Sequence, residues 1–230
     1  MGKLFNFLKT LAYPFLPVKR IEYAEPIGEE PCIFLANHIG AVGPMYMAIT
    51  FPLCGNVAIW CNEGMMREDM IVDYVRHDWW WKPESRLAAL YSATIPYIAR
   101  AIAPKVLRSA PTIAVCRDAR IMSTMRKSLA ALNEGKHIVI FPERPDGFDS
   151  HAEHLQMGWL NLVPMYRRAT GRDIRLIPVH IDEKARVFRV GKAVTVNPEV
   201  PLKEQEREIE RYLAAGLRGE KLLGDGADQT

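Results

Sequence analysis

Two polar loops carry most of the side chains that could do chemistry, and each follows a short apolar run. Asn37 and His38 follow one such run, and Glu143 and Arg144 follow another. A histidine exchanges its proton near neutral pH, and carboxylate and guanidinium groups bind polar or charged partners. These two loops are therefore the candidates for the chemistry of the protein. A lone histidine after a strand is also a common structural residue, so the pair alone leaves both interpretations open.

The elements that must position these loops alternate between strands and helices. Apolar runs predict strands at 32–36, 57–60, 112–116, 137–141 and 175–181, with a hairpin-like pair around 187–196. Helical patterns lie at 44–51, 67–75, 87–107, 123–133, 158–170 and 202–217. This alternation predicts one α/β domain with a mostly parallel central sheet flanked by helices. Parallel sheets hold their reactive loops at the carboxyl ends of the strands, so we expect both polar loops at that edge.

A dense polar cluster follows the second loop. It consists of Asp146, Asp149, His151, Glu153 and His154. Imidazole and carboxylate groups suit zinc or iron, but no defined ligand spacing such as H-E-x-x-H is present. The sequence therefore favours a solvated loop, and we expect no metal ion. A metal-dependent hydrolase built on the two histidines stays open as a third alternative.

The first twenty residues form a distinct amphipathic segment. Leu4, Leu8, Leu11 and Phe15 recur at helical spacing, and Phe5 widens the apolar face. The segment has four Lys or Arg residues and no Asp or Glu. An apolar face flanked by cations is typical of a helix that lies in a membrane interface, although a terminal helix docked on its own domain has the same pattern. We expect these five apolar side chains to associate with a membrane.

The charge of the whole chain is nearly balanced. Its 230 residues include 30 Lys or Arg and 27 Asp or Glu, a net charge of +3. This balance excludes a general polyanion binder, and we expect no nucleic-acid partner. The first twenty residues hold four of the cations, which leaves 26 basic against 27 acidic residues elsewhere. The positive excess therefore lies on the amphipathic segment.

No apolar run approaches the ~20 residues that a membrane-spanning helix needs. No small-residue cleavage site follows an apolar run near the start, and the four cysteines form no C-x-x-C pair. We therefore expect reduced thiols and a peripheral protein on the cytoplasmic face of a membrane. The expected organisation is a membrane-associating segment at 1–20, the α/β domain at 21–218 and a frayed tail at 219–230.

Four ordered blocks give a more specific indication. They are Asn37-His38, Ile113-Ala-Val-Cys-Arg117, Ile140-Phe-Pro-Glu143 and Leu176-Ile-Pro-Val-His180. Their order resembles the glycerolipid acyltransferase family of the lysophosphatidate (1-acylglycerol-3-phosphate) acyltransferase type. That family has an N-H-x-x-x-x-D block, a strand ending in Arg, an F-P-E-G-T/S-R block and an apolar I-P-V block. The resemblance covers roughly residues 30 to 182.

The resemblance implies phospholipid biosynthesis: transfer of a fatty acyl group from an acyl thioester to a hydroxyl of a lysophospholipid or related glycerolipid. The thioester, acyl-CoA or acyl carrier protein, is a co-substrate, and no cofactor is implied. His38 matches the general base that takes the hydroxyl proton. Arg117 matches the arginine for the acceptor phosphate, where a guanidinium fork fits phosphate oxygens. Glu143 matches the glutamate that shapes the acceptor site, and Asn37 matches a residue that orients the loop.

The sequence departs from the family pattern at two places. The aspartate expected five residues after His38 is Gly43. In a Ser-His-Asp triad such a carboxylate holds the histidine tautomer, and Asp118 and Asp149 are the candidates to replace it here.

The second departure follows Glu143, where G-T/S-R is replaced by Arg144-Pro145-Asp146. Arg144 is therefore the candidate for the missing arginine. Both departures leave open an alternative function, that of a catalytically impaired relative that binds lipid or acyl carrier without turnover.

Overall fold

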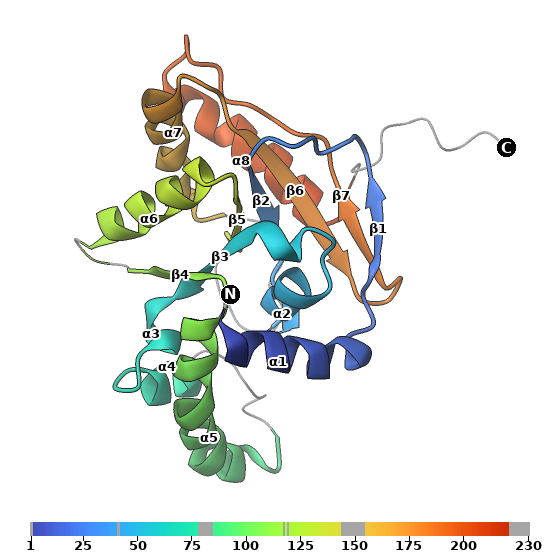
Figure 1. The fold of residues 1–230 in the computed structure, drawn as a ribbon, viewed down its shortest axis with the longest axis vertical. Coiled ribbons are helices and arrows are strands. Elements are labelled where there is room, and N and C mark those ends of the chain that lie inside the picture. Colours follow the sequence, from blue (N-terminus) through green and yellow to red (C-terminus); the bar gives the residue numbers. More distant parts are fainter. Residues whose placement is uncertain are drawn as a thin grey trace, which may run out of the picture.

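A central sheet organises the protein (Figure 1). The computed structural model describes residues 2–40, 42–77, 85–116, 118, 120–143 and 155–220. Seven strands form the sheet within these residues, in the order β1-β7-β6-β2-β5-β3-β4. They are β1 (Arg20–Tyr23), β2 (Cys32–Ala36), β3 (Val57–Asn62), β4 (Thr112–Val115), β5 (His137–Ile140), β6 (Arg175–Asp182) and β7 (Val187–Val190). Every neighbouring pair is parallel except β6 and β7.

The helices connect these strands. They are α1 (Lys3–Ala12), α2 (Val42–Ile49), α3 (Glu63–Met66), α4 (Ile71–His77), α5 (Ala88–Ser109), α6 (Ile121–Asn133), α7 (Leu162–Thr170) and α8 (Leu202–Leu217). Short 3₁₀ turns cover Tyr13–Phe15, Cys54–Asn56 and Met157–Asn161. The predicted α/β architecture with a mostly parallel sheet flanked by helices is confirmed.

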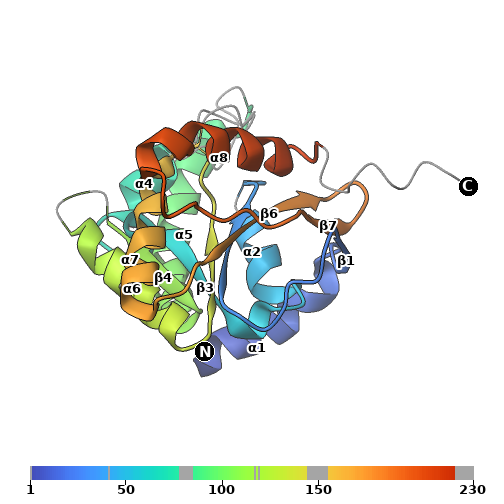
Figure 2. The ribbon, with the colours of Figure 1, turned by 90° about the horizontal axis from the view of Figure 1, so that it is seen from above.

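The two faces of the sheet carry separate apolar cores. Ile33 and Leu35 of β2 belong to the core that includes α6, α7 and α8, whereas Phe34 and Ala36 belong to the core with α1 and α2. Figure 2 shows α7 and α2 on opposite sides of the central strands. Every residue of β2 and β5 is buried, which explains why β2 is a continuous apolar run and why β5 is apolar after His137 instead of alternating.

A smaller apolar cluster joins α4 and α5 outside these two cores. It consists of Ile71, Val75 and Ala99. These helices, with α3, form the crossover from β3 to β4, and Val106 near the end of α5 reaches the core beside α1 and α2. Helix α5 is continuous through Pro96 and Pro104, both of which are buried.

Helix α1 is docked on the domain through its first residues. The backbone N–H of Gly2 donates to the carbonyl of Ser109, and that of Phe5 donates to the Ser109 hydroxyl. Phe5 is buried in the core, so its prediction as a membrane-associating residue is wrong. The physical reason is the rotation of the helix, which turns Phe5 inward and leaves Leu4, Leu11 and Phe15 exposed. Leu8 is half-buried.

Several element boundaries differ from those predicted. Strand β1 and helix α3 were not expected, and the helix predicted at 67–75 begins only at Ile71. The strand β7 pairs with β6 and not with the residues that follow it. None of the described helices is both long enough and apolar enough to cross a membrane. Most of the tail predicted at 219–230 lies outside the described residues.

Candidate functional site

The site is built where β2 and β5 end. These two strands are parallel neighbours, with Leu35 opposite Ile140, so the residues that follow them emerge at the same edge. The backbone N–H of His38 donates to a carboxylate oxygen of Glu143 over 2.7 Å. The two loops, 105 residues apart in the sequence, therefore form one site, as the parallel sheet predicts.

The surroundings of His38 are partly aromatic. Its imidazole meets the ring of Phe141 edge-on, with 5.4 Å between ring centroids. The residue itself is exposed. The site therefore presents an exposed histidine whose ring contacts Phe141 and whose backbone binds the Glu143 carboxylate, and an imidazole can accept a proton from a hydroxyl group.

Gly43 lies directly beneath the His38 loop. A Cβ atom at this position would be 3.3 Å from the Asn37 carbonyl, 3.5 Å from a Phe141 ring carbon and 3.8 Å from the His38 Cα. A side chain here would thus begin next to His38, where the resemblance calls for an aspartate. These contacts are close, but a shift of a few tenths of an ångström in the neighbouring atoms would accommodate a side chain. The backbone at this position therefore does not by itself exclude an aspartate.

Asn37 fastens the end of β2 to β6. Its side-chain oxygen accepts from the Ile181 N–H over 2.6 Å, and its amide nitrogen donates to the Ile181 carbonyl over 3.3 Å. These side-chain hydrogen bonds take the place of backbone hydrogen bonds between β2 and β6 at the point where β2 ends. Asn37 therefore orients the loop that carries His38.

The described residues on either side of the segment 144–154 are bonded to each other. An antiparallel bridge joins Glu143 to Leu155, and the Gln156 N–H donates to the Pro142 carbonyl over 2.7 Å. Arg144, Asp149 and the histidine cluster of this segment lie outside the described residues, and so does Arg117.

Asp118 does not accompany His38. It follows β4, three strands from β2, which corresponds to about 14 Å at the usual strand spacing. Its carboxylate instead accepts from the Arg120 guanidinium, with the Arg120 Nε 2.9 Å from Oδ2. The prediction that Asp118 replaces the missing acid is therefore wrong, because the sheet order separates the ends of β2 and β4.

The same edge of the sheet holds an ion network that sequence reasoning missed. Both carboxylate oxygens of Glu63, at the end of β3, accept from Arg120 over 2.8 Å, and Arg67 adds a longer contact of 3.4 Å. Hydrogen bonds from Arg120 hold the pKa of Glu63 below its usual range. Arg120 also holds the pKa of Asp118 below its usual value. The only signal was the polar Asn62-Glu63 pair after an apolar run, because nothing in the sequence brings Arg120 near it.

A buried tyrosine joins α2 to the end of β6. Tyr46 of α2 donates its hydroxyl to Glu183, directly after β6, over 2.8 Å. Burial, followed by the nearby Glu183 carboxylate, raises the pKa of Tyr46 to about 12. This bond fixes α2, and with it Gly43, against the carboxyl end of β6.

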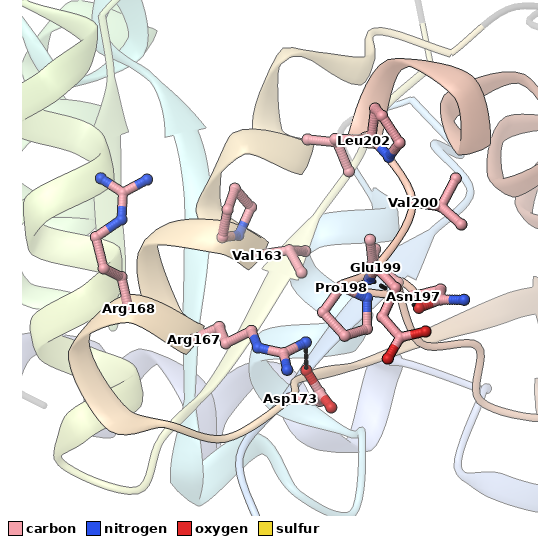
Figure 3. A pocket seen from close by; sticks show the side chains of 12 residues that line it. Val163, Arg167, Arg168, Asp173, Asn197, Pro198, Glu199, Val200 and Leu202 are labelled. Carbon is pink, nitrogen blue, oxygen red and sulfur yellow. Dashed lines mark hydrogen bonds and ion pairs between the residues drawn. The ribbon is translucent and has the colours of Figure 1, made fainter.

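One hollow of about 740 Å³ lies elsewhere (Figure 3). It is formed by α7 and the segment that leads into α8, with Val163, Val196 and Leu202 among its lining residues. An ion pair of 3.0 Å joins Arg167 and Asp173 across one side. Asp173 stands just before β6, so this hollow is at the amino ends of the strands, away from His38.

Among the described residues, no three metal-ligating side chains gather into a group that could hold an ion. No protein-family model, no curated protein and no solved structure matches this chain. The fold and the site define an α/β protein whose polar groups meet at the carboxyl edge of a parallel sheet. The choice of chemistry thus rests on the residues of the site itself.

Proposed function

We propose that this protein is an acyltransferase of the glycerolipid type, which moves a fatty acyl group from a thioester to a lipid hydroxyl. The observation that carries the proposal is the hydrogen bond from the His38 N–H to Glu143. It joins the first and third of the four ordered sequence blocks. No matching family model supports the assignment, so it depends on these short blocks and their geometry.

The exposed imidazole is the base in the proposed reaction. The acceptor hydroxyl oxygen attacks the thioester carbonyl carbon while its proton passes to His38. The tetrahedral intermediate then collapses to the ester, the C–S bond breaks, and the thiolate takes the proton from the imidazolium. Free thiol and acylated lipid are the products, and the base is regenerated. No covalent acyl-enzyme is needed.

Glu143 is a positioning residue in this scheme. Its carboxylate holds the His38 backbone, and Asn37 holds the same loop from the side of β6. Two independent contacts therefore limit the movement of the base. Such preorganisation keeps the reacting groups aligned when substrate binds.

Membrane association belongs to the same proposal. The acceptor is a lipid, and Leu4, Leu11 and Phe15 are exposed on a segment with no acidic residue. We expect the protein to work at the membrane surface, on the cytoplasmic side. The acyl donor is expected to be acyl-CoA or acyl carrier protein.

A second candidate function is favoured by Gly43. Gly43 brings no carboxylate to the position where the resemblance calls for an aspartate, and the Asp118 carboxylate is bound to Arg120. In this alternative, the protein is a catalytically impaired relative of the acyltransferases that binds lipid or acyl carrier without turnover.

The deciding experiment follows thiol release. Purified protein is given long-chain acyl-CoA or acyl carrier protein together with a panel of lysolipid acceptors. For an acyltransferase we expect acceptor-dependent thiol release that falls at least about 100-fold in His38→Ala, the usual range for loss of a general base. His77→Ala, a change at an exposed histidine of α4, should keep the wild-type rate. Equal, slow release by wild type and His38→Ala would instead support the binding protein.

The Gly43→Asp variant tests whether an added carboxylate beside His38 raises the rate of thiol release. If His38 lacks an orienting acid, the aspartate should raise thiol release at least about tenfold, a small part of the roughly 10⁴-fold effect of tautomer control in a serine protease triad. Gly43→Ala is the matched control, since it brings the same Cβ contacts without the carboxylate. Equal rates in the two variants would mean that another group already orients the base.

A further inference from the structure

We propose that helix α5 is a second membrane-binding element, which docks beside α1 on a bilayer that contains anionic lipid. The proposal extends the membrane association given above for α1 and rests on it for the orientation of the protein. It concerns a helix that carries none of the residues of the catalytic scheme.

The first observation is an exposed apolar stripe along α5. Leu90, Tyr97, Ile98 and Ile102 are each 53–58% exposed and recur at helical spacing. Helix α5 has 22 residues and is thus about 33 Å long. A long helix with one buried and one exposed apolar side matches an element that lies in an interface, not one that crosses it.

The second observation is the contact between α5 and α1. The Gly2 N–H donates to the Ser109 carbonyl over 2.8 Å, and the Phe5 N–H donates to the Ser109 hydroxyl over 2.9 Å. Figure 1 shows both helices at the lower end of the molecule, away from α7 and α8. The start of α1 therefore contacts the end of α5, and both segments expose apolar side chains. We call the two stripes together the α1–α5 surface; its residues are Leu4, Phe7, Leu11, Phe15, Leu90, Tyr97, Ile98 and Ile102.

The third observation is the charge of these two segments. No Asp or Glu occurs in residues 1–21 or 85–117, although the chain has 27 acidic residues. Helix α5 carries Arg100, Lys105 and Arg108, all exposed. Among the described residues, no ion pair involves a cation of α1 or α5. Arg108 donates to the Met66 carbonyl and Lys9 to the Cys54 sulfur, but no described carboxylate neutralises the charge of these cations.

The excess of cations on the α1–α5 surface favours an anionic membrane as its binding partner over a second copy of the chain. A second copy of the chain, packed through the same face, would set cations against cations with no acid to compensate. A bilayer with anionic lipid offers both a negative surface and an apolar interior, and each nearby Lys or Arg adds to the attraction. Tyr97, like Tyr13 beside α1, suits the headgroup region, where aromatic residues with a polar tip are enriched.

The test is binding of the full-length protein to sedimented vesicles. Phosphatidylcholine vesicles with and without phosphatidylglycerol are compared for wild type, Ile98→Ser/Ile102→Ser and Arg100→Gln/Lys105→Gln. We expect wild type to prefer the anionic vesicles and each double variant to bind them about tenfold more weakly, because the first loses buried apolar area and the second loses charge attraction. Met122→Ser, at an exposed apolar residue of α6, is the matched control and should bind like wild type.

Thermal unfolding checks that each variant is folded, which is expected because all five changed side chains are exposed. Wild-type binding by the Ile98→Ser/Ile102→Ser variant would overturn the proposal and leave α1 as the anchor. Equal binding to both kinds of vesicle would overturn its anionic part. A wild-type dimer that ignores vesicles and becomes monomeric in this variant would assign the surface to self-association instead.

The test is separable from catalysis. His38→Ala should bind vesicles like wild type even though it loses thiol release. If wild type binds anionic vesicles through α5 but releases no thiol with any acceptor, the proposed reaction fails and the membrane surface stands.

Discussion

His38, the base of the proposed reaction, is restrained through its backbone. The Glu143 carboxylate accepts from the His38 N–H, which leaves the imidazole itself exposed beside Phe141. A carboxylate that binds the main chain restrains the loop without consuming a ring nitrogen.

Glu143→Ala should therefore cost both stability and rate. Loss of a charge-assisted hydrogen bond at a partly exposed position is worth about 1–2 kcal/mol, measured by urea unfolding. Glu143→Gln keeps an acceptor oxygen and should lie between wild type and Glu143→Ala in thiol release. Glu134→Ala removes an exposed carboxylate that pairs with Lys136 after α6, so it should change neither quantity. Unchanged stability and rate in Glu143→Ala would show that the contact restrains nothing.

A second histidine predicts how stability depends on pH. His137 is buried at the start of β5, and its Nδ1 lies 3.1 Å from the Cys32 sulfur. Burial, with a contribution from the Arg175 charge, lowers the pKa of His137. Burial also raises the pKa of Cys32 to about 12, so the thiol stays protonated at neutral pH and can donate to the imidazole.

The unfolded chain binds a proton at His137 more readily than the folded chain does. This contribution to stability is complete above the ordinary histidine pKa of about 6.5 and is lost as the pH falls below it. Urea unfolding should therefore show a decline in stability between pH 7.5 and pH 5.5, and the decline should be smaller in His137→Gln. His77→Gln, at an exposed histidine of α4, serves as the control. The same slope in wild type and His137→Gln would refute the assignment.

At the scale of elements, the segment formed by α1 and the residues after it up to Val18 contributes both to the core and to the surface. Phe5, Leu16 and Val18 are buried, whereas Phe7 and Phe15 are 67% and 81% exposed. The two roles can be separated by experiment because they use different side chains of one segment.

Removal of residues 1–18 should destabilise the domain by at least about 3 kcal/mol, since deletion of a single buried Phe side chain costs that much. Phe7→Ser/Phe15→Ser should leave urea unfolding nearly unchanged and weaken binding to anionic vesicles. A truncated protein of wild-type stability would contradict the docking seen here.

The elements also show what a sequence can and cannot reveal. The strands β2 and β5 were predicted because burial on both faces demands continuous apolar runs, and α8 begins and ends at the predicted residues 202 and 217. The strand β1 was missed because only its pairing with β7, far along the chain, makes it a strand. The pair of Glu63 and Arg120 was missed for the same reason, since the order of strands decides which loops meet.

At the scale of the whole molecule, charge and apolar exposure are distributed unevenly. Acidic residues are absent from two segments that contact each other through α1 and α5, and apolar side chains are exposed on both helices. The net charge of +3 hides this separation. A nearly neutral protein can therefore bind an anionic surface through one region.

Salt should weaken vesicle binding without abolishing it. The Debye length falls from about 10 Å at 0.1 M to about 3 Å at 1 M salt, so the attraction of exposed cations is screened while the burial of apolar side chains is not. Sedimentation over this range should show a several-fold loss that levels off for wild type. Arg100→Gln/Lys105→Gln should respond less to salt. Complete release of the wild type at high salt would indicate that charge alone holds the protein.

The bond between the His38 amide and Glu143 also makes a spectroscopic probe of the site. An amide of an exposed residue normally exchanges its hydrogen with solvent rapidly, but this one is donated to a carboxylate over 2.7 Å. Its exchange rate and its proton chemical shift therefore report whether the two loops are joined. A single nuclear magnetic resonance signal could follow the assembly of the site as ligands are added, before any turnover is measured.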